Sequence, residues 1–139
     1  MLPFSLTLAT GESPYRQIVF SATRAIVSGE LPAGSTFPSV RELSQALKIN
    51  PNTAQKAIGE LVRDGLLEVR PGIGTVVTSG RRASAGERRR LLSAEVDQLI
   101  VEAKRMGLTR DEVMNAVGLR WDALFGDGTA VKPSVRGAR

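Results

Sequence analysis

The stretch FPSVRELSQALKINPNTAQKAIGELV, residues 37–62, decides the fold. Within it, Ser39 and Glu42 have the spacing of a capping box, in which each side chain accepts a hydrogen bond from the other residue's backbone amide. A short amphipathic helix is therefore expected to begin after Ser39, and its apolar pattern predicts that it ends at Lys48.

A second helix is predicted to begin at the polar segment NPNT, residues 50–53. Asn50 is a good N-cap, and Pro51 fits the first helical position, where no amide donor is missed. Two helices joined by so short a turn predict a helix-turn-helix over residues 40–59. The residues expected to face the core from the second helix are Ala54, Ala57, Ile58, Leu61 and Val62.

Both flanks extend this motif into a winged helix, residues 12–79. Upstream, the pair Ser13–Pro14 indicates the start of a helix whose apolar stripe continues to Gly29. Downstream, LLEVR, PGIG and TVVTS (66–79) have the order strand, turn and strand, which predicts a β-hairpin wing. The alternating stretch FSLTL (4–8) indicates a further short strand.

The remaining chain predicts a second helical region. Residues 80–86 are small and polar, which indicates a linker, and residues 126–139 are expected to be a disordered basic tail. Two helices within residues 87–125 carry apolar stripes but have too little chain to bury them alone, so we expect a homodimer. The expected dimerisation residues are Leu92, Val96, Leu99, Val117 and Leu124, with Trp121 in the core.

The fold class that follows is mainly α with a small β-hairpin wing. An N-terminal winged helix-turn-helix is followed by a C-terminal two-helix dimerisation module.

The composition of the 139 residues narrows the function. The chain has no cysteine and no histidine, which excludes disulfides, thiol nucleophiles and histidine-built metal sites. The GIGT sequence (72–75) lies in the predicted hairpin, so it is not a nucleotide-binding loop. We therefore expect no enzyme activity, no cofactor and no metal. Neither a membrane span nor a convincing signal peptide is visible, so a cytoplasmic location is expected.

The charge distribution indicates a polyanionic partner. The net charge is +5, yet residues 1–79 carry seven Lys/Arg and six Asp/Glu, a net of only +1. If this part binds DNA, a few well-placed cations must do so. The cluster RRASAGERRR (81–90) either contacts phosphates or is a solvated linker and helix start.

The start of the second helix of the motif has the chemistry of base recognition. A helix-turn-helix inserts this end of its second helix into the major groove of double-stranded DNA, where Asn and Gln pair with adenine and Thr contacts thymine. The candidates are Asn52, Thr53, Gln55 and Lys56. Capping alone explains Asn50 and Pro51 but explains Asn52 and Gln55 poorly.

The pieces FPSVRELS, NPNTAQKA and DGLLEVRPGIGT, with their spacing, resemble the DNA-binding domain of GntR-type bacterial transcription regulators. YRQI (15–18) together with NPNT and the short C-terminal part is similar to the YtrA subfamily. The resemblance implies that Arg41 contacts DNA, and that Gly72, flanked by Arg70, approaches the minor groove. Gly72 is equally well explained by the backbone conformation of the turn.

Two departures from the family pattern limit what the resemblance implies. Many relatives have arginines where this chain has Pro51 and Gln55, so their base readout does not transfer. The larger ligand-binding domains of other GntR-type regulators have no counterpart, so the sequence identifies no effector small molecule.

The leading hypothesis is a homodimeric repressor that binds an inverted-repeat operator; the resemblance implies a transporter operon as its target. The alternative is a winged-helix protein-interaction module without sequence-specific DNA readout. Arg41 and the polar helix tip distinguish the two, because an interaction module would not need them.

Overall fold

The computed structural model describes residues 2–79 and 83–126, which form parts of two compact units. One unit spans residues 1–81 and the other spans residues 82–139. None of the described helices has the length and apolar composition needed to cross a membrane.

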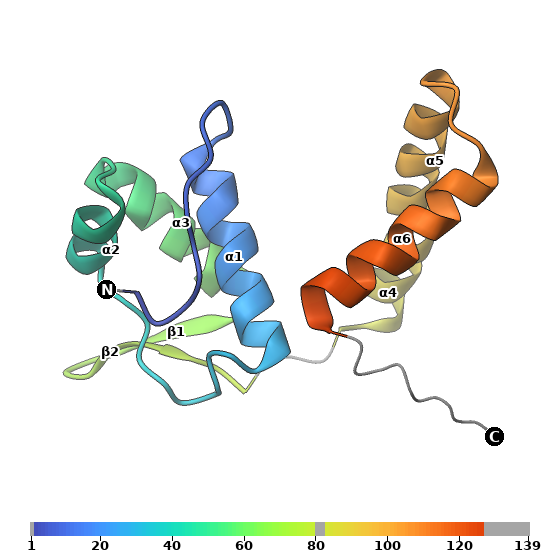
Figure 1. Ribbon diagram of the computed structural model, residues 1–139. Helices are drawn as coiled ribbons and strands as arrows, with labels where there is room; N and C mark the ends of the chain where they lie inside the picture. Colours follow the sequence, from blue (N-terminus) through green and yellow to red (C-terminus); the bar gives the residue numbers. More distant parts are fainter. Residues whose placement is uncertain (1, 80–82, 127–139) are drawn as a thin grey trace. The chain divides into compact units, whose positions relative to one another are not determined.

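The first unit is a winged helix, as the sequence predicted (Figure 1). Its helices are α1 (Pro14–Ser28), α2 (Val40–Leu47) and α3 (Pro51–Arg63). They are followed by the antiparallel hairpin of β1 (Leu67–Arg70) and β2 (Gly74–Val77). Helix α3 contacts α1, α2 and β1, so it lies at the centre of the unit.

The local hydrogen bonds that begin and end the helices match the sequence signals. The Ser13 hydroxyl accepts from the Arg16 amide at the start of α1, and Gly29 ends that helix with φ of 90°. At α2, Ser39 and Glu42 form both bonds of the capping box, with lengths of 2.9 and 3.1 Å. These boundaries are therefore fixed by short-range chemistry.

The segment before α1 belongs to the core but is not a strand. Phe4 is 5% exposed, and its ring stacks on Phe37 with 5.6 Å between centroids. The expected strand at residues 4–8 is absent. One amide within this stretch and one just after it pair with side chains. Ser5 donates to Glu30, and Ala9 donates to Gln17.

The wing is supported by the loop between α1 and α2. The Phe37 amide donates to the Thr75 carbonyl at 2.8 Å, and the Val77 amide donates to the Ser35 carbonyl at 2.8 Å. This loop thus pairs with β2 and covers the edge that β1 leaves free. The buried apolar cluster of the unit consists of Phe4, Ile18, Ala22, Ala25, Leu31, Phe37, Leu43, Ala54, Ala57, Ile58, Leu61, Leu67 and Val77.

Within residues 83–126, the second unit contains two helical segments. The first runs through α4 (Ala85–Arg90), a π-helical turn η1 (Leu91–Glu95) and α5 (Val96–Arg105); the second is α6 (Arg110–Phe125). The first segment begins two residues earlier than the expected Glu87, because Ser84 and Glu87 form a capping box of their own.

The second unit has almost no core. Within residues 83–126, only Ala103 is buried. The expectation that Trp121 is a core residue is wrong for the single chain, since this side chain is 63% exposed and lies beside Phe125. The predicted linker lies partly outside the described residues, and so does the predicted tail after Gly126.

Candidate nucleic-acid interface

The turn between α2 and α3 is tight and locally stabilised. Lys48 ends α2 with φ of 57° and ψ of 51°. This left-handed backbone conformation is uncommon for residues other than Gly, Asn and Asp. The next amide, that of Ile49, donates to the Ser44 carbonyl at 3.0 Å. Asn50 then accepts the Asn52 amide at 2.7 Å and begins α3. The two helices are thereby held in the helix-turn-helix arrangement.

The N-terminal end of α3 presents polar side chains to solvent. Capping accounts for Asn50 and Pro51, as the sequence suggested. Asn52 and Gln55 are exposed, and neither side chain hydrogen-bonds to another described residue; Thr53 is half-buried. Free amide groups at this end of the helix can donate to and accept from a base edge.

Arg41 lies in the first turn of α2 and is also exposed. Within residues 2–79 and 83–126 its guanidinium has no carboxylate partner. Arg63, in contrast, pairs with Glu60. The charge of Arg41 is therefore available to an external anion.

The structure gives each of the wing candidates, Arg70 and Gly72, a role within the protein itself. The Arg70 Nε donates to Glu68 Oε2 at 2.6 Å, so its charge is partly compensated. Gly72 lies in the three-residue loop between the strands with φ of 79°, a conformation that accounts for a glycine without DNA.

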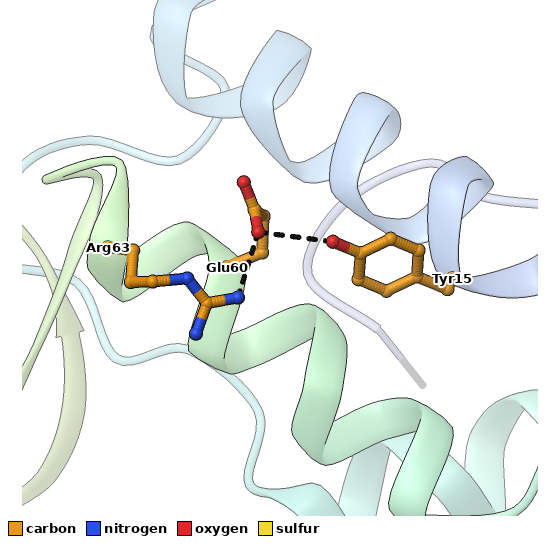
Figure 2. A network of polar contacts seen from close by, with 3 residues as sticks. All are labelled: Tyr15, Glu60 and Arg63. Atoms are coloured by element: carbon orange, nitrogen blue, oxygen red, sulfur yellow. Dashed lines mark hydrogen bonds and ion pairs between the residues drawn. The ribbon is translucent and has the colours of Figure 1, made fainter.

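Lys56 lies on α3 with its ammonium 4.8 Å from the centre of the Tyr15 ring, a cation–π contact. The Tyr15 hydroxyl donates to Glu60 Oε1 at 3.1 Å, and Arg63 Nη2 donates to the same oxygen at 2.8 Å (Figure 2). This network joins α1 to α3. Sequence reasoning missed it, because the periodicity of each helix carries no information about contacts with the other helix.

The pKa shifts in the network follow from these contacts. Burial raises the pKa of Tyr15, and the hydrogen bond to Glu60 raises it further. The hydrogen bonds from Arg63 and Tyr15 lower the pKa of Glu60, and the carboxylate in turn raises the pKa of Arg63. At neutral pH the network therefore contains a protonated phenol, an ionised carboxylate and a guanidinium.

In the second unit, α5 and α6 make few contacts with each other and leave an apolar groove of about 920 Å³. Three of the five predicted dimerisation residues line it: Val96, Leu99 and Val117. Leu92 and Leu124 do not; Leu92 is 73% exposed and Leu124 is half-buried. Four residues outside the predicted dimerisation set also line the groove: Ile100, Ala103, Val113 and Met114. The apolar pattern of the sequence includes the first three, whereas Met114 was not predicted.

The described part of the chain has no cluster of acidic side chains that could hold a metal ion.

Comparison with known proteins places these features in a family. Residues 14–77 match the model of the gntR family of bacterial regulatory proteins. The chain is 31% identical over 103 residues to the uncharacterised helix-turn-helix regulator YhcF of Bacillus subtilis, covering 74% of this chain and 85% of YhcF. It is also 31% identical over 100 residues to the repressor YtrA of the same organism, covering 71% of this chain and 77% of YtrA.

A solved structure has a similar fold. The transcriptional antiterminator of Listeria monocytogenes superposes with a TM-score of 0.78, covering 96% of this chain and 98% of that one, at 23% identity. Identity this low supports the fold alone. Regulators of the gntR family bind DNA and are not enzymes. From this family match and the similarity to YhcF and YtrA over most of their length, the chain belongs to the GntR family of bacterial transcriptional regulators and is of the YtrA type.

Proposed function

We propose that this protein is a homodimeric repressor that binds an inverted-repeat operator in double-stranded DNA. The observation that carries the proposal is the exposed tip of α3, where Asn52 and Gln55 have no partner among the described residues. Buried or internally bonded side chains could not read a base, whereas these amides are free to do so.

The proposed contacts divide by chemistry. Asn52, Thr53 and Gln55 face base edges in the major groove, and Arg41 contacts a base or a phosphate. Gly72, at the tip of the wing, approaches the minor groove, with Arg70 beside it. Lys56 contributes charge from the side of α3.

Dimerisation is supported by the open groove between α5 and α6. A single chain leaves Leu99 and Val117 each 49% exposed, and a second copy would cover them. A two-fold axis then implies an inverted repeat, with recognition helices roughly 34–36 Å apart or a multiple of that distance. The repressor assignment is supported by the similarity to YtrA, which is named a repressor.

Binding-site selection from a random duplex library tests the proposal. The wild type should enrich an inverted repeat, and the Asn52→Ala/Gln55→Ala double variant should enrich a different or weaker one. Non-specific binding should remain, because it depends on phosphate charge. Gln98→Ala, an exposed glutamine on α5, is the matched control and should select the wild-type sequence. If the wild type enriches nothing, the protein-interaction alternative is favoured instead.

A further inference from the structure

Tyr15 contacts two successive turns of α3 at once. Lys56 and Glu60 are four residues apart, so they lie on the same side of the helix. The Tyr15 ring lies against the ammonium of Lys56, and its hydroxyl reaches Glu60. A side chain of α1 thus sets the surroundings of a lysine on the helix that carries the candidate base contacts.

The network also determines which cation is paired with the Glu60 carboxylate. Glu60 is the natural ion-pair partner of Lys56 because of their spacing. Its Oε1 instead accepts from both Tyr15 and Arg63 (Figure 2). Among the described residues, the ion pair of Glu60 is with Arg63 and not with Lys56. The carboxylate charge is therefore compensated by Arg63, and no carboxylate within residues 2–79 and 83–126 forms an ion pair with Lys56.

We propose that Tyr15 is a positioning residue that holds Lys56 ready to bind a DNA phosphate. A cation–π contact occupies one side of the ammonium and leaves N–H donors for an anion. A lysine ammonium binds phosphate as a point charge. Because the Lys56 side chain is held against Tyr15 of α1, it is badly placed to hydrogen-bond to a base edge. The proposal rests on the proposed function only for the identity of the ligand, DNA.

The low charge of this unit makes one such lysine significant. Residues 1–79 have a net charge of only +1, and the carboxylates of Glu60 and Glu68 already pair with Arg63 and Arg70. Because non-specific affinity depends on how many phosphates are neutralised, each free cation carries a large share of it.

The test measures how affinity for a duplex of random sequence depends on salt, from about 50 to about 200 mM. Lys56→Gln should weaken binding to all sequences alike and reduce the salt slope by about one. Tyr15→Leu should shift the slope in the same direction although the lysine is retained, and adding Lys56→Gln should then have little further effect. Tyr15→Phe retains the ring and should stay close to the wild type. Arg120→Gln, which removes an exposed charge from α6, is the control and should leave the slope unchanged.

Proton NMR of the free protein checks the contact itself. The Tyr15 ring should shift the signals of the Lys56 side-chain methylene protons upfield, and this shift should persist in Tyr15→Phe and disappear in Tyr15→Leu. If Tyr15→Leu does not fold, Tyr15→Met takes its place.

Several results would overturn the proposal: an unchanged slope in Lys56→Gln, additive effects of the two substitutions, or a changed base preference in Lys56→Gln. A purely structural Tyr15 would lower the melting temperature without changing the slope. A random duplex requires no sequence preference, so failure here is distinct from failure of the operator selection.

Discussion

Leu99→Asp should convert the proposed dimer into single chains that remain folded. Leu99 lines the groove between α5 and α6 and is 49% exposed in the single chain. Burying a whole leucine side chain is worth about 1.5–3 kcal/mol, so covering the exposed half contributes roughly 1 kcal/mol per copy. Lys104 and Arg110 also line the groove and would partly compensate a carboxylate. We therefore assign its desolvation only about 1 kcal/mol per copy, well below the cost of an unpaired buried charge.

Two-fold symmetry applies the change twice, which gives a loss of about 4 kcal/mol and a roughly 10³-fold weaker dimer. Sedimentation velocity over a concentration series measures this shift, and circular dichroism confirms that the helices persist. Leu119→Asp is the matched control, because Leu119 is 61% exposed on α6 and does not line the groove. The reasoning is refuted if Leu119→Asp dissociates the dimer as much as Leu99→Asp, or if the wild type sediments as a monomer at micromolar concentration.

Three further substitutions test other parts of the chain. Arg41→Ala should weaken operator binding by ~1–3 kcal/mol if the guanidinium contacts a base; unchanged affinity in a mobility-shift titration would remove Arg41 from the interface. Phe4→Ala should lower the free energy of unfolding by about 3–5 kcal/mol in a urea titration, because the ring is buried against Phe37; a much smaller loss would mean that the N-terminal segment is dispensable. The Ser39 amide lowers the pKa of Glu42, so the stability from this charge is present above the ordinary glutamate pKa and is lost as pH falls through the lowered one. The difference in urea midpoint between wild type and Glu42→Gln should therefore close at acid pH, and a constant difference would contradict this account.

Local chemistry made the winged helix predictable from the sequence. Ser39 with Glu42, Asn50 with Pro51, and Gly29 act on amides and carbonyls within a few residues, so their spacing alone fixed the helix ends. Contacts between distant segments were not predictable in this way. Phe4 reaches Phe37 only through the tertiary fold, and so the segment before α1 read as an isolated strand.

In the first helical segment of the second unit, a π-helical turn interrupts the periodicity on which the predicted dimerisation stripe depended near Leu92. The sequence pattern assumed α-helical periodicity throughout residues 87–105, which aligns Leu92 with Val96. In η1 the hydrogen bonds run between residues five apart, which also brings Leu91 toward the side of Val96. No residue in LLSAE announces this change, since each of them is compatible with an α-helix.

The winged helix has little net charge and the helical unit has little core, so in the proposed dimer DNA binding and dimerisation should be coupled. The winged helix has a closed core but a net charge of only +1, whereas the helical unit has apolar surface that one chain leaves uncovered. A single winged helix should therefore hold DNA weakly, while a dimer converts binding at the second half-site into an intramolecular step worth about 10²–10⁴ in avidity. Linkage requires the operator to strengthen dimerisation by the same factor. Leu99→Asp should accordingly lower operator affinity by no more than this factor, and operator supplied at about one duplex per two chains should partly restore its pairing. A variant that lost all DNA binding would instead indicate that the second unit contacts the operator directly.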